Sequence, residues 1–137
     1  KVLVIGGGLV GMEVADYCRE QGCDNLTLVE ELPRSPVTKF TSHGYMLHTR
    51  FRKAGYNMIV KASVQKITPE SVSILIDENE QVLPVDHVIV AVGTQPRNEL
   101  QSFLEEQGIT FQVVGDALKG RRIIEAVEEG ARAAWSL

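Results

Sequence analysis

The sequence predicts an α/β fold, in which a parallel sheet forms most of the core and a small antiparallel β-meander accompanies it. Two short apolar runs, 2–5 and 26–29, are continuous, which is typical of parallel strands buried on both faces. A glycine-rich turn and a stretch with helical spacing connect the two runs. Strand, turn, helix and strand within roughly 30 residues make a βαβ unit with a right-handed crossover, the building block of Rossmann-like sheets.

The first helix is expected directly after the glycine turn and ends at Gly22. Its expected inward residues recur at helical spacing: Val10, Val14, Tyr17 and Cys18. Segment 31–39 contains two prolines and is expected to be a loop. A second helix is expected over 41–54, with four candidate inward residues: Tyr45, Leu47, His48 and Phe51. Gly55 ends that helix, and 56–60 resembles a third strand.

The apolar period then changes. Alternation of apolar and weaker positions over 71–76 predicts a strand with one more apolar face. A polar stretch, 77–80, is expected to be a hairpin turn, so that 62–67, 71–76 and 81–85 form a three-stranded antiparallel meander. The run 87–92 is continuously apolar again and is expected to return to the parallel sheet.

The carboxyl-terminal part is expected to contain two helices and one strand. Asn98 is expected to cap a helix that runs to Gln107, followed by a strand over 110–114 and a helix over roughly 120–136. Trp135 is expected to anchor the last helix by packing. The glutamates of that helix are expected to form a solvated face: Glu125, Glu128 and Glu129.

Composition is that of one globular domain of 137 residues, with 44% hydrophobic residues and a net charge of −4. The acidic balance argues against nucleic-acid and anionic-membrane partners. Cys18 and Cys23 match neither a redox nor a zinc spacing and are expected to be reduced thiols in a cytoplasmic protein. His43 and His48 have no third ligand beside them, so no metal site is expected. The chain opens directly on an apolar strand, so we expect a piece of a longer protein.

Three glycines form a phosphate-binding pattern. Gly6, Gly8 and Gly11 give G-x-G-x-x-G between a buried strand and a helix. The first glycine permits a tight turn, the second lets the backbone approach a pyrophosphate, and the third lets the helix pack close to the strand. The helix N-terminus offers free N–H groups and partial positive charge. The pattern predicts dinucleotide binding; the alternative is a merely structural turn.

Glu30 ends the second apolar run, 19 residues after Gly11. A carboxylate at that place hydrogen-bonds the adenosine ribose hydroxyls and repels a 2′-phosphate, which favours NAD(H) over NADP(H). Arg34 lies four residues further on and would neutralise a 2′-phosphate if its loop folds back. Asp116 is a second acid at the end of an expected strand, a position that usually faces a ligand crevice.

Three stretches carry a resemblance to a known family. Residues 2–15, VLVIGGGLVGMEVA, resemble the inner dinucleotide-binding domain of two-dinucleotide flavoproteins. Residues 91–97, AVGTQPR, and 113–134, VVGDALKGRRIIEAVEEGARAA, resemble the NADH:flavin oxidoreductases of the old-yellow-enzyme-related group, which includes dienoyl-CoA reductase and trimethylamine dehydrogenase. The resemblance covers nearly the whole chain.

The resemblance implies a larger protein: a barrel with FMN and a 4Fe-4S cluster, then a split FAD domain with an NAD(P)H domain inserted in it. Electrons pass from NAD(P)H through FAD and the cluster to FMN, although some members keep a vestigial nucleotide site. In this chain, 1–95 would be the NAD(P)H domain with its meander, and 96–137 a returning strand and helix of the FAD domain. The partners would be the missing FAD and barrel domains.

The resemblance also assigns residues. It implies an NAD(P)H site made by Gly6, Gly8, Gly11 and Glu30. Glu13 corresponds to an acid that often lies near the nicotinamide; as an alternative, it is a solvated acid favoured by the helix dipole. Gly93 and Thr94 correspond to the turn back into the FAD domain, and Asp116 to the acid that hydrogen-bonds the flavin's ribityl or pyrophosphate region.

These residues predict an NADH-binding electron-input domain of a multi-cofactor flavin oxidoreductase. Two alternatives stay open: a vestigial ADP-binding module, and the inner NADH domain of a pyridine-nucleotide disulfide reductase. No catalytic residue is expected, because the cofactors perform hydride transfer, and we expect the isolated chain to be inactive. We also expect 110–136 to fold back onto the domain or to form a homodimer through its apolar strand.

Overall fold

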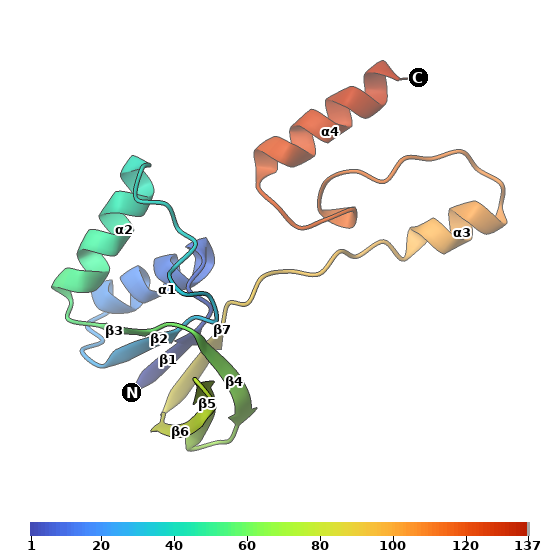
Figure 1. Ribbon diagram of the computed structural model, residues 1–137. Helices are drawn as coiled ribbons and strands as arrows, with labels where there is room; N and C mark the ends of the chain where they lie inside the picture. The colour runs from blue at the N-terminus through green and yellow to red at the C-terminus, as the bar shows by residue number, and fades with distance from the viewer. Residues whose placement is uncertain (137) are drawn as a thin grey trace. The chain divides into compact units, whose positions relative to one another are not determined.

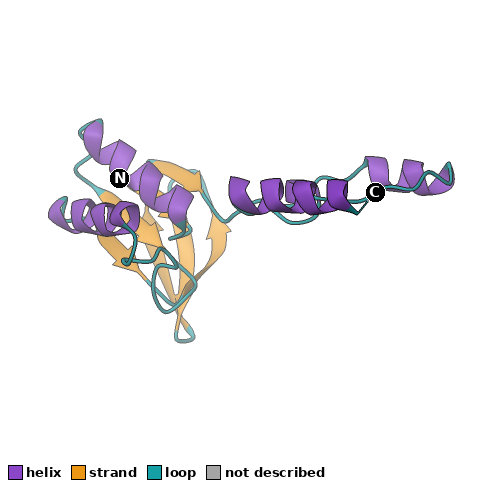
Figure 2. Ribbon diagram, turned by 90° about the horizontal axis from the view of Figure 1, so that it is seen from above, coloured by secondary structure: helices purple, strands orange, loops and turns teal. Residues whose placement is uncertain are grey.

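The computed structural model describes residues 1–136. The chain forms two compact units, Lys1–Val92 and Gly93–Leu137. The first unit contains every strand in the described part of the chain, drawn in orange in Figure 2. The second consists of helices and irregular segments. An α/β fold with a parallel sheet and a separate antiparallel sheet is confirmed.

The main sheet of the first unit has four parallel strands in the order β3-β2-β1-β7. These strands are β1 (Val2–Ile5), β2 (Leu26–Val29), β3 (Asn57–Ile59) and β7 (His87–Val90). The two central strands, β1 and β2, are the continuous apolar runs from which they were predicted. Their apolar composition fits this position, because both faces of the sheet are covered. The expected return of 87–92 to the parallel sheet is confirmed by β7, which pairs with β1, and Val90 and Val92 are exposed at this edge of the sheet.

Two helices, α1 (Leu9–Glu20) and α2 (Ser42–Lys53), pack on one face of this sheet (Figure 1). Their core contacts come from a set of fully or nearly buried side chains: Val4, Met12, Ala15, Leu28, Leu47 and Phe51. His48 is half-buried, and its Nε2 lies 2.9 Å from the carbonyl oxygen of Val37.

The inward faces expected for the helices are partly wrong. Val10, Tyr17 and Tyr45 are all more than half exposed. In α1 the reason is Gly11, which lies against the first glycine of the turn and thereby sets the rotation of the helix. The buried positions are consequently Gly11, Met12 and Ala15, while Val10 and Tyr17 turn outward.

The second face of the sheet is covered by an antiparallel meander, β4 (Ala62–Ile67), β5 (Ser71–Ile76) and β6 (Asn79–Pro84) (Figure 1). It contributes buried side chains to a second core layer: Ala62, Val72 and Ile74, packed with Leu3, Ile5 and Val29. The hairpin turn is shorter than expected. Asp77 and Glu78 alone make it, both with positive φ, as a type I′ hairpin loop requires, and Asn79 already belongs to β6.

The second unit contains α3 (Leu100–Glu106), a 3₁₀ turn η1 (Gly115–Ala117) and α4 (Ile123–Trp135). The strand expected over 110–114 is absent from it, because a strand needs a hydrogen-bonded neighbour and the described residues of this unit supply none. Asn98 does not cap α3; its side-chain amide donates to the side chain of Gln101. Trp135 is exposed, so the expectation that it anchors the last helix by packing is wrong. No helix within residues 1–136 is both long and apolar enough to cross a bilayer.

An ion-pair cluster joins the two helices of the first unit. Asp16 of α1 accepts hydrogen bonds from Arg50 of α2 at 2.8 Å and from Arg19 at 2.9 Å, and its side chain is 12% exposed. Burial by itself raises the pKa of Asp16, but the two arginines outweigh burial and hold that pKa below its ordinary value of 3.8.

Because this pKa is lowered on folding, ionised Asp16 stabilises the fold above pH 3.8, and the contribution is lost as the pH falls through the folded-state value. We therefore expect Asp16→Asn to lower the free energy of unfolding by about 1–3 kcal/mol near neutral pH. The difference in the free energy of unfolding between Asp16→Asn and the parent chain should be smaller at pH 3 than at pH 7. Urea unfolding at both pH values measures it, with the exposed Asp24→Asn as the control. An Asp16→Asn chain as stable as this control at pH 7 would contradict the expectation.

Candidate dinucleotide site

The glycine turn lies at the carboxyl end of β1, and its first and third glycines are required by close backbone approach. Gly6 has a φ of +105°, and a Cβ there would lie 2.3 Å from the carbonyl oxygen of Ala91 after β7. A Cβ on Gly11 would lie 1.9 Å from the carbonyl oxygen of Gly6. Since real Cβ atoms do not approach so closely, both positions need glycine for the fold itself.

The second glycine differs from the other two. A Cβ on Gly8 would meet nothing within 4 Å, so no contact within the fold explains a glycine at this position. Gly8 is the N-cap of α1 and has no capping side chain, and the first turn of the helix carries no acid. The N–H groups of the first helical turn therefore have no partner within the helix, and the space beside Gly8 is open. This is the geometry that admits a pyrophosphate.

Glu30 follows β2 and is the one charged residue buried in the described chain, at 8% exposure. One of its carboxylate oxygens, Oε2, accepts from the N–H of Gly7 at 2.6 Å, and Oε1 accepts from the N–H of Leu32 at 2.8 Å. These two bonds hold the carboxylate against the glycine turn, and each oxygen keeps a further lone pair for a ligand hydroxyl. The glycine turn and Glu30, which the sequence analysis assigned to one site, therefore lie together in the structure.

The proline-containing loop that follows Glu30 folds back onto the glycine turn. The hydroxyl of Ser35 donates to the carbonyl oxygen of Gly7 at 2.6 Å, and the N–H of Lys61 donates to the carbonyl oxygen of Leu32 at 3.1 Å. Arg34 lies in this loop and is exposed. Sequence reasoning missed Ser35, because a contact across 28 residues leaves no local pattern.

Glu13 is half-exposed on α1, where its Oε1 lies 2.9 Å from Nε2 of His43 on α2. Glu13 and His43 are both solvent-exposed, so the alternative of a solvated acid stays open for Glu13. Its expected place near the nicotinamide stays a prediction. The contact between His43 and Glu13 was also not predicted from the sequence. No group of three or more His, Cys, Asp or Glu side chains placed to hold a metal occurs within the described residues.

Gly93 and Asp116 belong to the second unit. Gly93 has a φ of +97°, and Gly115, just before Asp116, has a φ of +63°. The Asp116 side chain is exposed and accepts a hydrogen bond from the N–H of Arg121 at 3.3 Å. Thr94 also packs in this unit, since a Cβ on Gly120 would collide with its hydroxyl oxygen at 2.0 Å.

The turn around Asp116 is held by a glutamate that was expected to be solvated. Glu129 accepts from the N–H of Gly115 at 2.8 Å and pairs with the guanidinium of Arg121. Arg121 and this backbone bond lower the pKa of Glu129. Glu125 likewise pairs with Arg122 and completes a capping box at the start of α4, so the expected solvated face is wrong for these two glutamates.

Known proteins resemble this chain over its whole length. "NADH oxidase" of Thermoanaerobacter brockii is 36% identical over 139 residues, which cover 100% of this chain and 21% of the relative. "Bilirubin reductase" of Mediterraneibacter gnavus is 35% identical over 135 residues, 98% of this chain and 21% of the relative. The chain thus spans only a small part of both relatives.

The fold is shared with solved structures of other proteins. Histamine dehydrogenase from Rhizobium sp. 4-9 matches with a TM-score of 0.78 at 19% identity, covering 100% of this chain and 23% of that protein. At this identity the likeness concerns the fold alone. Residues 1–118 match the family described as pyridine nucleotide-disulphide oxidoreductase. The chain therefore belongs to the pyridine nucleotide-disulphide oxidoreductase family.

Proposed function

We propose that this chain is the NADH-binding, electron-input domain of a longer flavin-dependent oxidoreductase, and that it delivers hydride from NAD(P)H to FAD. The observation that carries the proposal is the buried Glu30 carboxylate, fixed by two backbone N–H groups beside a glycine turn with an unobstructed second glycine. Family membership supports the proposal.

The residues of the first unit would bind and orient the dinucleotide. The N–H groups at the start of α1 would take the pyrophosphate, and Glu30 would accept hydrogen bonds from the adenosine ribose hydroxyls. The charge of Glu30 disfavours a 2′-phosphate, so NADH is the proposed cofactor. Arg34 lies on the loop that folds back, which leaves NADPH as the weaker ligand rather than an excluded one. When bound, the nicotinamide supplies the hydride itself.

Asp116 and Gly93 would belong to a second site, for FAD, completed by parts of a longer polypeptide. The positive-φ turn at Gly115 and the exposed Asp116 carboxylate fit a ligand-facing turn. We propose the old-yellow-enzyme-related group for the whole protein, with FMN and a 4Fe-4S cluster in other domains. The resemblance of residues 91–97 and 113–134 supports this assignment. On this view the isolated chain is inactive.

Titration of the chain with NADH, NADPH and ADP tests the proposal. We expect NADH to bind more tightly than NADPH and more tightly than ADP, and the nicotinamide protons to shift on binding in NMR spectra. Glu13 resonances should shift with NADH and not with ADP if this acid lies near the nicotinamide. Equal affinity for ADP and NADH without nicotinamide shifts would contradict an electron-input role and identify a vestigial nucleotide module.

A further inference from the structure

Two arginines of the first unit stand apart from the others. The chain has eight arginines, and six of them form ion pairs with carboxylates. Within residues 1–136, Arg34 and Arg52 are the two that do not. The chain carries a net charge of −4, and these two guanidinium groups of one unit are free to pair with carboxylates of another molecule.

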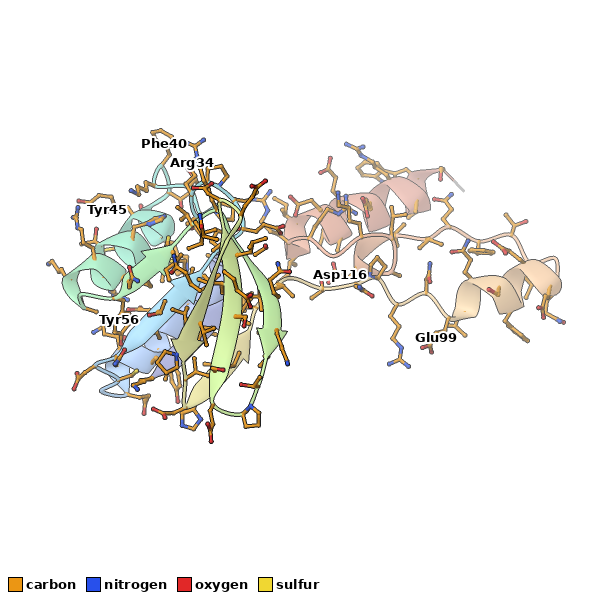
Figure 3. The ribbon with its side chains drawn as sticks, turned by 60° about the horizontal axis from the view of Figure 1, so that its bottom comes forward. Arg34, Phe40, Tyr45, Tyr56, Glu99 and Asp116 are labelled. Atoms are coloured by element: carbon orange, nitrogen blue, oxygen red, sulfur yellow. The ribbon has the colours of Figure 1, made fainter. Side chains whose placement is uncertain are left out.

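Both arginines line one continuous groove beside β3. It consists of two adjoining hollows that share Lys39, His48 and Met58. One hollow also contains Arg34, Phe40 and Val60, and the other Tyr45, Arg52 and Tyr56. No aspartate or glutamate lines either hollow. We call this the β3-edge groove; its labelled residues surround α2 in Figure 3.

Exposed aromatic side chains accompany the cations. Phe40 is fully exposed, and Tyr45 is 58% exposed. The exposed surface of these two aromatic side chains makes no contact in the fold, and its burial under a partner would contribute up to about a few kcal/mol. The groove therefore offers apolar surface between positive charges.

The backbone along the groove is also unpaired. β3 is an edge strand of the parallel sheet. The carbonyl oxygen of Ile59 accepts from the N–H of Glu30, so the backbone of Ile59 faces β2. Because successive residues of a strand alternate in direction, the N–H and carbonyl groups of Met58 point away from the sheet. Met58 lines both hollows. An extended chain laid in the groove would meet these groups.

We propose that the β3-edge groove binds an extended acidic segment of a partner protein, which adds as a strand beside β3. Met58 supplies backbone hydrogen bonds, Phe40 and Tyr45 supply apolar contact, and Arg34 and Arg52 pair with carboxylates at the two ends. The lining places Arg52 with the residues before β3 and Arg34 with those after it. Positions 56 to 60 of an extended strand span about 13 Å, so the partner's acids should lie about four or more residues apart.

A peptide is favoured over a nucleic acid because three cations in a chain of net charge −4 cannot neutralise a phosphate backbone. The dinucleotide uses the glycine turn and Glu30, not Met58 or Tyr45. Arg34 is the one groove residue that would also meet the 2′-phosphate of NADPH, and ADP and NADH lack that phosphate. The groove is therefore expected to bind its ligand independently of ADP and NADH.

The test uses the 137-residue chain and a fluorescein-labelled nonapeptide: two glutamates, five alternating threonines and valines, and two glutamates. Fluorescence anisotropy at low salt should show binding, with no binding of the same peptide carrying lysines for glutamates. Arg34→Ala and Arg52→Ala should each weaken the affinity about two- to fivefold. The matched control is Lys53→Ala, a neighbouring exposed cation outside the groove. Circular dichroism confirms that each variant folds.

Two further measurements separate strand addition from charge attraction alone. A peptide N-methylated at alternate residues should lose at least about tenfold in affinity when the methylated amides face β3. Saturating ADP should leave peptide binding unchanged. The proposal is overturned if the lysine peptide binds equally, if ADP displaces the acidic peptide, or if Arg34→Ala and Arg52→Ala behave as Lys53→Ala does. Failure of NADH binding would leave this outcome unaffected, since the assay contains no nicotinamide.

Discussion

Replacement of Gly11 by alanine is expected to destabilise the first unit by about 1–3 kcal/mol, whereas the same change at Gly8 is expected to be nearly neutral for stability. The added methyl group at Gly11 would lie 1.9 Å from the carbonyl oxygen of Gly6, so α1 must move away from β1. At Gly8 the methyl group meets nothing within 4 Å, and its φ of −72° suits alanine.

The dinucleotide affinity should respond differently. Gly8→Ala places a methyl group where the pyrophosphate approaches the backbone, so NADH affinity should fall at least about tenfold although the fold is intact. Gly11→Ala should lose both stability and affinity. Urea unfolding and NADH titration of the two variants measure these effects. If Gly8→Ala bound NADH as the parent chain does, the glycine turn would be structural rather than a phosphate site.

Glu30→Gln is expected to lower the affinity for NADH about tenfold or more and to reverse much of the preference over NADPH. The substitution removes the charge that repels a 2′-phosphate and weakens the hydrogen bonds to the ribose hydroxyls, each worth about 1.5–3 kcal/mol when one partner is charged. Parallel NADH and NADPH titrations measure the ratio. The neighbouring exposed Glu31→Gln is the control, and equal ratios in the two variants would rule out Glu30 as the ribose ligand.

Glu30 also contributes to the stability of the fold. Glu30→Ala would leave the N–H groups of Gly7 and Leu32 without their acceptor, at a cost of about 1–3 kcal/mol for each group that stays buried. Glu30→Gln keeps an acceptor for only one of them. Stability should therefore fall in the order parent chain, Glu30→Gln, Glu30→Ala, and urea unfolding of the three chains would measure it.

The parts of the fold that sequence reasoning predicted are those written in local patterns. The central strands, the glycine turn and Glu30 each occupy a short stretch of sequence. The residue types within that stretch are enough to predict the local structure. The meander was also predictable from its alternation of apolar residues, because period two has no other common explanation.

The errors arose where a contact between distant segments decides the outcome. Helical spacing placed Val10 on the inward face, although the glycine pattern had already predicted that Gly11 packs against the first strand; the structure confirms Gly11 and leaves Val10 exposed. The apolar character of 110–114 could not make a strand without a neighbour to pair with. Ser35 and His43 entered the candidate site through contacts across 28 and 30 residues, for which a single sequence carries no signal.

The glutamate clamp on the Asp116 turn has a consequence for any ligand that uses this turn. Glu129 holds the N–H of Gly115 and the side chain of Arg121 through contacts within the chain itself, so folding alone sets the left-handed backbone at Gly115. Ordering a flexible loop on binding would otherwise oppose association by about 1–2 kcal/mol for each residue fixed. Here that entropy is lost during folding instead, so a ligand that binds at this turn would not have to offset it.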